Sequence, residues 1–444
     1  MPPPRRALPL FPEGVPAMPA APRITTRGAA PTPRYVVWEL TLRCDLACHH
    51  CGSRAGKPRA GELGRDEALA IVQDLASMGT REVALIGGEA YLAPHFLDVV
   101  RAVAGAGIRC SMTTGGRGLD AATARAAREA GMAAVSVSVD GLEATHDRLR
   151  GVAGSHRAAL AAIGHVRDAG MEAFANTQWN RLNLPEVEPL GDLLLDAAIL
   201  AWQVQLTGPM GRAADWPDLL LQPHEMLDLV PRLAALAERA LARGCRVEAS
   251  NNLGYFGPHE HLLRAAHWQG CTAGIHVLGI EADGSVKGCP SLPSAPYVGG
   301  NLRTSSLREI WEETAPLRFA RDRNESELWG YCARCYYAAE CRGGCSWTAH
   351  TLLGRRGNMP YCHHRALELQ REGRRERLVH REAAPGLPFD FGRFELVEEA
   401  WEGRDQCLPA SDPPVCPPSL PASLPLGEAS GPSGAGGKPP RGGP

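Results

Sequence analysis

The sequence lacks the features that mark membrane, secreted and nucleic-acid-binding proteins. It has no run of about 18 or more uncharged apolar residues, so we expect no membrane span and no membrane partner. Proline interrupts the start, MPPPRRALPLFPEGVPAMPA, where a signal peptide needs a continuous apolar stretch. The 47 Lys and Arg residues against 49 Asp and Glu residues give a formal net charge of −2, which leaves no basic excess for nucleic acid. We therefore expect a cytoplasmic protein without a nucleic-acid partner.

Cysteine is the residue type whose number is informative. The 444-residue chain has 14 cysteines, whereas a secreted disulfide scaffold is short and cysteine-dense. In a cytoplasmic chain, clustered cysteines are more often metal ligands. Three of them lie between positions 44 and 51, and seven lie between positions 271 and 362. The clustering therefore predicts metal binding.

The composition divides the chain into six parts. Both ends are rich in proline and cannot bury enough apolar surface to offset the entropy of ordering, so we expect them to be disordered. The parts are a disordered Pro-rich N-terminus (1–34), an α/β domain (35–215), a helical linker (216–265), a Cys-rich domain (266–373), a charged extension (374–406) and a disordered Pro/Gly-rich tail (407–444).

The segment from 35 to 215 alternates apolar runs with amphipathic helical stretches, several of which end in glycine as helix C-caps do. Six strands in a row with helices between them predict an α/β fold with a parallel sheet and outer helices. Six units are too few for a closed eight-stranded barrel, and an open partial barrel and a doubly wound sheet both fit. The predicted strands are 35–42, 82–86, 108–113, 134–139, 172–177 and 202–206.

A cysteine loop follows the first predicted strand. In the sequence TLRCDLACHHCGSRAG, Cys44, Cys48 and Cys51 form a C-x3-C-x2-C arrangement. Three thiolates in a short loop can hold three corners of a [4Fe–4S] cluster, which leaves the fourth iron open to another ligand. A structural zinc loop is the alternative, with His49 or His50 as the fourth ligand.

Glycines and polar residues end the next strands in order. The second strand ends in Gly-Gly-Glu (87–89), the third in Thr-Thr-Gly-Gly (113–116) and the fourth in SVSVDG (136–141). Together with the cysteine loop, these motifs resemble those of the radical S-adenosylmethionine (SAM) enzymes. The sequence departs mildly from the family motifs at two points. His50 replaces a common aromatic residue, and the third turn lacks the asparagine of many relatives.

This resemblance implies a fold, a chemistry and a set of ligands. The fold is a partial (β/α)6 TIM-like barrel over 35–215. A [4Fe–4S] cluster at Cys44, Cys48 and Cys51 delivers one electron to SAM, which splits to methionine and a 5′-deoxyadenosyl radical that abstracts a substrate hydrogen. No catalytic acid or base is assigned. The implied SAM-binding residues are Gly87, Gly88, Glu89, Ser138, Asp140, Asn176 and Gln205.

The seven later cysteines follow a second pattern. Cys271 and Cys289 enclose Gly284, and a C-x2-C-x5-C-x3-C run and one more cysteine follow. This pattern resembles the SPASM domain, which lies C-terminal to the barrel in many peptide-modifying radical SAM enzymes. A pair of zinc sites is the alternative. The resemblance implies two auxiliary [4Fe–4S] clusters, and three in total: auxiliary cluster I at Cys271, Cys289 and Cys345, and auxiliary cluster II at Cys332, Cys335, Cys341 and Cys362.

Auxiliary cluster I has three cysteines in this assignment. Its fourth position is left to an open iron, to His276 or to a substrate thiolate, and we favour the open position. In SPASM relatives the auxiliary clusters either move electrons or bind the substrate, and the sequence does not separate these roles.

The resemblance predicts a radical SAM oxidoreductase that matures a ribosomally made peptide by an oxidative cross-link or a similar modification. Pro290 follows Cys289, where sulfatase-maturating relatives carry a catalytic Asp, so that branch is disfavoured. The implied partners are a precursor peptide and a flavodoxin- or ferredoxin-type electron donor. Because 34 residues before the barrel are too few for a peptide-binding domain, the leader would bind the barrel and SPASM surfaces or a separate leader-peptide-binding protein. The alternatives are an enzyme acting on a tetrapyrrole or other small molecule, and a non-catalytic iron–sulfur or zinc electron-transfer protein.

Overall fold

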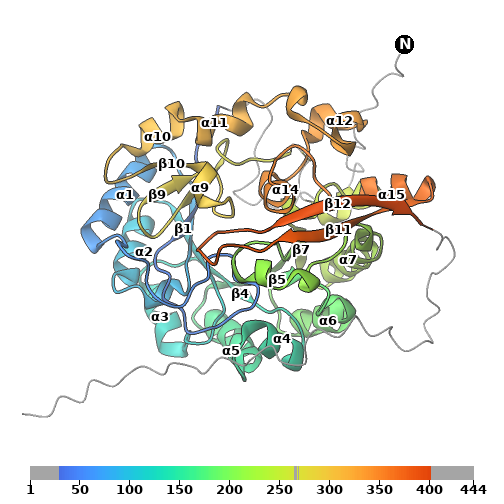
Figure 1. The fold of residues 1–444 in the computed structure, drawn as a ribbon. Helices are drawn as coiled ribbons and strands as arrows, with labels where there is room; N and C mark the ends of the chain where they lie inside the picture. Colours follow the sequence, from blue (N-terminus) through green and yellow to red (C-terminus); the bar gives the residue numbers. More distant parts are fainter. Residues whose placement is uncertain (1–29, 265–267, 269, 402–444) are drawn as a thin grey trace, which may run out of the picture.

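The computed structural model describes residues 30–264, 268 and 270–401 (Figure 1). Most of the two ends predicted to be disordered lies outside the described residues, as do Cys407 and Cys416. Within the described residues, no helix is both long enough and apolar enough to cross a bilayer.

The barrel is built on a parallel sheet whose first six strands are those predicted. None of their residues is exposed and most are buried, as expected for parallel strands covered on both faces, although those of β6 alternate between buried and partly buried. These strands are β1 (Tyr35–Glu39), β2 (Glu82–Ile86), β3 (Arg109–Thr114), β4 (Ala134–Ser138), β5 (Glu172–Trp179) and β6 (Ala201–Leu206). They lie in sequence order in the sheet, and each pairs in parallel with the next.

Helices cover the outside of this sheet, as Figure 1 shows for the blue to green part of the chain. In the first helix the buried residues are Ala68, Ile71, Val72 and Leu75, a spacing of three and four that turns one face to the strands. The helices of this part are α1 (Arg65–Ser77), α2 (Phe96–Gly105), α3 (Ala121–Glu129), α4 (Glu143–Arg150), α5 (Ser155–Asp168), α6 (Val187–Asp196) and α7 (Met226–Ala242).

The sheet continues beyond the six predicted strands at both edges. Strand β7 (Arg246–Ala249) pairs in parallel with β6, and β8 (Val277–Ile280) pairs in parallel with β1. Two antiparallel strands, β9 (Ser285–Lys287) and β10 (Val298–Asn301), extend the β8 edge. The sheet therefore has ten strands in the order β10-β9-β8-β1-β2-β3-β4-β5-β6-β7, and the start of the Cys-rich part belongs to the same sheet as the barrel.

Short helices make up most of the Cys-rich part and the segment before it. They are α8 (Glu260–Leu263), α9 (Ser294–Tyr297), α10 (Leu307–Glu313), α11 (Ala315–Asp322), α12 (Tyr331–Arg334), α13 (Ala338–Cys341), α14 (Ser346–Leu353) and α15 (His363–Arg371). The large apolar core of the barrel extends into this part through residues such as Leu307, Trp311 and Tyr361. A smaller separate core consists of Ala273, Leu292, Tyr297, Phe319 and Ala320.

The charged extension forms an antiparallel hairpin of β11 (Arg374–Glu382) and β12 (Arg393–Ala400), drawn in red in Figure 1. Its strands pack against α14 and α15. The tip of the hairpin returns to the cysteine loop of the barrel, where the amide of Phe389 donates to the Gly52 carbonyl.

Candidate active site

The loop after β1 presents three thiols, and each accepts a hydrogen bond from the protein. The amide of Leu46 donates to Cys44 Sγ at 3.4 Å, and the amide of Ala55 donates to Cys51 Sγ at 3.4 Å. Cys48 Sγ accepts from the guanidinium of Arg150 at 3.7 Å. Hydrogen bonds to cysteine sulfur help to set the charge and the potential of a metal centre bound there.

The loop after β6 holds the cysteine loop in place. Arg212 donates from Nε to the carbonyl of Cys48 at 2.6 Å and from Nη1 to the carbonyl of Ala55 at 2.9 Å. Gly211 precedes it with a φ of 60°, and a Cβ there would lie 2.3 Å from the carbonyl oxygen of Gly52. A glycine is therefore required for this close approach.

The Gly-Gly-Glu turn after β2 lies directly against the backbone of the same loop. The amide of Gly88 donates to the Thr41 carbonyl at 2.8 Å, and the amide of Glu89 donates to the Arg43 carbonyl at 2.8 Å. A Cβ on Gly87 would lie 2.2 Å from the Thr41 oxygen, and one on Gly88 would lie 2.1 Å from the Arg43 oxygen. The two glycines thus allow the turn to fix the position of Glu89 relative to the cysteines.

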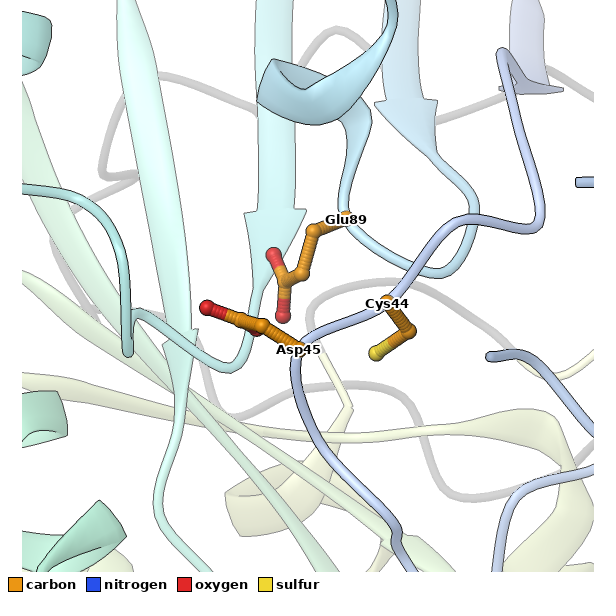
Figure 2. Close-up of side chains that lie close together, drawn as sticks. All are labelled: Cys44, Asp45 and Glu89. Carbon is orange, nitrogen blue, oxygen red and sulfur yellow. The ribbon is translucent and has the colours of Figure 1, made fainter. Parts of the chain in front are cut away.

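The carboxylate of Glu89 is buried beside the first cysteine. It accepts hydrogen bonds from the Gly115 amide at 2.7 Å and from the Thr114 hydroxyl. Burial raises the pKa of Glu89 to about 7, although the Thr114 hydrogen bond opposes the shift. Figure 2 shows the Glu89 and Asp45 carboxylates and the Cys44 thiol turned toward one another, and one ligand atom of each lies within 4.8 Å of the others. Such a group of acceptors can bind a cation such as an ammonium.

A buried ionic group lies behind the cysteine loop. Asp140 Oδ2 lies 2.5 Å from Arg150 Nη2 and 3.0 Å from His50 Nε2, and its other oxygen accepts from the Gln178 amide at 2.9 Å. Burial opposes ionisation of this carboxyl, but Arg150 and His50 hold its pKa well below its usual range. Asp140 thereby links the cysteine loop to Arg150, which in turn donates to Cys48.

One cavity of about 620 Å3 contains most of the residues singled out in the sequence. It is lined by the three cysteines of the loop and, at its other side, by Cys271, Cys289 and Cys345. Of the seven residues expected to bind SAM, six line it: Gly87, Gly88, Glu89, Ser138, Asn176 and Gln205. Asp140 is fully buried outside the lining, with its carboxylate occupied by His50 and Arg150.

The remaining four cysteines surround a separate small cavity of about 20 Å3. Cys332, Cys335, Cys341 and Cys362 line it together with aromatic residues that include Tyr255, Tyr331 and Tyr337. The structure thus separates the seven SPASM-like cysteines into a group of three and a group of four, the same division that the resemblance implies.

The spacing of the cysteines differs from that of a zinc site. Four thiolates around one zinc ion lie about 3.8 Å apart, since each Zn–S bond is about 2.3 Å long. Among the described residues, one group of three Cys, His, Asp or Glu ligand atoms lies within 4.8 Å of one another, and that group is Cys44, Asp45 and Glu89. Within the described residues, no set of three cysteines therefore has its sulfurs all within 4.8 Å of one another.

The tip of the C-terminal hairpin closes against the cysteine loop. Arg54 Nε donates to Asp390 at 3.0 Å, and the amide of Phe389 donates to the Gly52 carbonyl at 3.1 Å. Arg54 and Phe389 both have positive φ, of 50° and 56°, which few residues other than glycine adopt. Such backbone strain persists where surrounding contacts hold it in place, and the contacts here join two segments far apart in sequence.

Comparisons with known proteins agree with this geometry. The family profile described as the radical SAM superfamily matches residues 38–183, and that of an iron–sulfur cluster-binding domain, SPASM, matches residues 271–336. AdoMet-dependent heme synthase of Methanosarcina barkeri is 32% identical over 345 residues, which is 75% of this chain and 97% of that protein. The chain belongs to the radical SAM superfamily. It is therefore a radical SAM/SPASM enzyme, and membership implies SAM and a SAM-binding [4Fe–4S] cluster as cofactors.

Other relatives of this radical SAM/SPASM enzyme act on different substrates or share the fold alone. Mycofactocin maturase MftC of Mycobacterium ulcerans is 29% identical, over 70% of this chain and 83% of that protein. The crystal structure of Streptococcus suis SuiB bound to S-adenosylmethionine covers 74% of this chain and 76% of SuiB, with a TM-score of 0.60 at 15% identity. The similarity to the SuiB structure confirms the predicted architecture, a TIM-like partial barrel followed by a SPASM domain.

Sequence reasoning missed the residues that hold the cysteine loop from a distance. Arg150 ends a helix that also contains the charged residues Asp147 and Arg148, so nothing in the sequence marks it as buried. Arg212 and Asp390 come from segments without a recognisable motif. Cys110 and Cys245, which follow neither cysteine pattern, are buried in the barrel core.

Proposed function

We propose that Cys44, Cys48 and Cys51 hold the SAM-binding [4Fe–4S] cluster and that Glu89 binds the amino group of SAM. The hydrogen bonds to all three thiols and the group of acceptors at Glu89, Asp45 and Cys44 support this assignment. The remaining SAM contacts would come from Gly87, Gly88, Ser138, Asn176 and Gln205, which line the same cavity. Asp140 acts on the cluster through Arg150 and His50 rather than by touching SAM.

We also propose two auxiliary clusters, as the division of the seven cysteines suggests. Cys271, Cys289 and Cys345 would hold auxiliary cluster I on the wall of the main cavity, and the other four cysteines would hold auxiliary cluster II. Because auxiliary cluster I shares the cavity with the SAM site, a substrate between them contacts both. A flavodoxin- or ferredoxin-type protein would supply the electrons.

The main support for the proposed function is the cavity that the cysteine loop shares with Cys271, Cys289 and Cys345. The bound SAM and its cluster supply a radical that removes a hydrogen atom from the substrate. The chain itself positions Glu89 through the two glycines and fixes the cysteine loop through Arg212 and the hairpin tip. Arg150 donates to a cluster ligand from a buried position, where its charge is little screened.

We propose a tetrapyrrole as the substrate, which was the alternative to a peptide in the sequence analysis. The support comes from the relatives, because the heme synthase of Methanosarcina barkeri is matched over 97% of its length, and an Fe-coproporphyrin III synthase from the same organism is also similar. A ribosomal peptide is the second candidate, and the mycofactocin maturases favour it. A precursor peptide and a separate leader-binding protein belong to that second candidate.

Anaerobic reconstitution followed by iron analysis and SAM cleavage tests the proposal. We expect about 12 iron atoms per chain, for three clusters of four. Cys48→Ala should abolish formation of 5′-deoxyadenosine and lower the iron content to about eight. Cys110→Ala is the matched control, because Cys110 is buried in the barrel core and should leave both values unchanged. Zinc in place of iron, or SAM cleavage that survives Cys48→Ala, would contradict the assignment.

Incubation with Fe-coproporphyrin III, SAM and dithionite tests the substrate. We expect a SAM-dependent change in the mass of the porphyrin and formation of 5′-deoxyadenosine that rises with porphyrin concentration. Cleavage of SAM without any change to the porphyrin would overturn the tetrapyrrole and leave the peptide candidate.

A further inference from the structure

The main cavity reaches the opposite end of the barrel from the cysteine loop. Arg34 directly precedes β1 and His276 directly precedes β8, and both residues line the cavity. The two strands are parallel neighbours with Tyr35 opposite Val277, so Arg34 and His276 lie side by side where the strands begin. A strand rises about 3.3 Å per residue, which places this pair about 15–20 Å from the cysteine loop that follows β1.

His276 lies in the cavity wall with one ring nitrogen unused. The residue is 6% exposed, its ring is hydrogen-bonded to the backbone of Thr32, and within the described part of the chain Nδ1 has no hydrogen-bond partner. Burial, followed by the charge of Arg34, lowers the pKa of His276, and Arg321 acts in the same direction. The groups that act on this ring are therefore two cations and a backbone carbonyl.

The two arginines near His276 also have unused donors. Among the residues that the structure describes, the guanidinium of Arg34 has neither an ion-pair nor a hydrogen-bond partner. Arg321 donates through Nε to the Gly274 carbonyl and stacks on Trp311, but its buried Nη2 has no partner within the same residues. Buried polar atoms such as His276 Nδ1 and Arg321 Nη2 are normally paired, and the half-buried Arg34 adds a positive charge beside them, so this group has the composition of an anion-binding site.

We propose that Arg34 and His276 bind a carboxylate of the substrate, on an arm distant from the carbon that reacts. The inference rests on the proposed tetrapyrrole substrate, whose carboxylate side chains lie around a wide flat ring. Arg34 supplies the charge, and Arg321 adds to the positive potential from behind the ring of His276. The pair would thereby fix which edge of the substrate faces SAM.

Proton uptake is a consequence of this arrangement. A neutral histidine that donates one ring N–H to Thr32 has a bare acceptor at Nδ1, so it must take up a proton before Nδ1 can donate to a carboxylate. The negative charge of the bound carboxylate offsets the positive charges of Arg34 and Arg321, and it therefore raises the pKa of His276 in the complex. Affinity should therefore fall as the pH rises through the pKa of the complex.

His276 was also a candidate ligand for auxiliary cluster I. The two roles give different spectroscopic results.

Equilibrium dialysis of the reconstituted enzyme tests the proposal with two probes, coproporphyrin III and its tetramethyl ester. We expect Arg34→Gln to weaken binding of the acid by about 10-fold to 100-fold and to leave binding of the ester unchanged, as for loss of a charge-assisted hydrogen bond. Arg34→Lys should restore part of the affinity. His276→Asn should remove the loss of affinity between about pH 6 and about pH 8. Arg303→Gln, which breaks an exposed ion pair with Glu67, is the control.

Two results would overturn the inference, and they differ from a failure of the proposed function. Equal affinity of wild type and Arg34→Gln for the acid would show that no carboxylate binds there, while the tetrapyrrole substrate would stand. A changed electron paramagnetic resonance signal of an auxiliary cluster in His276→Asn would assign the histidine to that cluster instead. Absence of binding of either probe to the wild type would overturn the tetrapyrrole substrate and the carboxylate site together.

Discussion

Single buried charges determine how the cysteine loop is held. Asp140 is fully buried, and it pairs with Arg150 from α4 and with His50 from the loop itself. The family resemblance implies Asp140 as a SAM-binding residue, but its partners in the structure depend on the path of α4, which no local pattern reveals. The family motif therefore identifies Asp140 as a candidate, whereas its ion pairs with Arg150 and His50 can be seen only in the structure.

Removing Arg150 should be strongly destabilising. Arg150→Ala leaves Asp140 buried with one partner fewer, and breaking a buried ion pair in this way costs about 3–5 kcal/mol. We expect a lower melting temperature and reduced iron at the cysteine loop, measured by calorimetry and metal analysis. Arg157→Ala is the matched control, because its ion pair with Glu143 spans 3.8 Å between side chains that are 81% and 64% exposed. Equal effects of the two variants would contradict the role assigned to Arg150.

At the level of elements, the length and charge of a segment decide whether its secondary structure can be predicted from the sequence. The six barrel strands are predicted because apolar runs alternate with long amphipathic helices. Strands β7 and β8 have four residues each, too few for a periodic pattern, and they form because β6 and β1 offer free edges. The hairpin of β11 and β12 has charges on much of its surface, and cross-strand ion pairs such as Arg381 with Glu395 stabilise it.

The tip of this hairpin should be needed to keep the cysteine loop closed. Asp390→Ala removes the contact with Arg54 but leaves Arg54 paired with Asp215, so we expect partial loosening, with cleavage near 383–392 about tenfold faster in limited proteolysis. Glu382→Ala, which breaks an exposed ion pair with Arg393 in the same hairpin, is the control and should have little effect. Unchanged proteolysis of Asp390→Ala would show that the backbone hydrogen bonds and apolar contacts of the tip hold it without the Arg54 ion pair.

At the scale of the whole molecule, the barrel and the SPASM part share one sheet but differ in how they are stabilised. The extensive apolar core of the barrel reaches α10 and α11, whereas α12 and α13, which carry Cys332 and Cys341, contain no buried residue. Segments with so little apolar core usually depend on metal or disulfides. The shared cavity could not be predicted from the sequence, because it depends on the pairing of β8 with β1 across more than 200 intervening positions.

Removal of iron should therefore loosen the SPASM part more than the barrel. In hydrogen exchange of the metal-free protein, we expect faster exchange in α12 to α14 and little change in β2 to β5. Binding energy at a metal site that is absent from the unfolded chain contributes directly to folding. Uniform acceleration across both parts would show that the clusters stabilise the whole sheet instead.

The contact between Arg54 and Asp390 joins residues 336 positions apart. At a translation rate of about 5–20 residues per second, roughly 17–67 seconds pass between the synthesis of the two side chains. During that interval the three thiols of the cysteine loop have already been synthesised, whereas the tip of the hairpin has not. We therefore expect the loop to be more accessible to iron and sulfide before the hairpin is complete than after it.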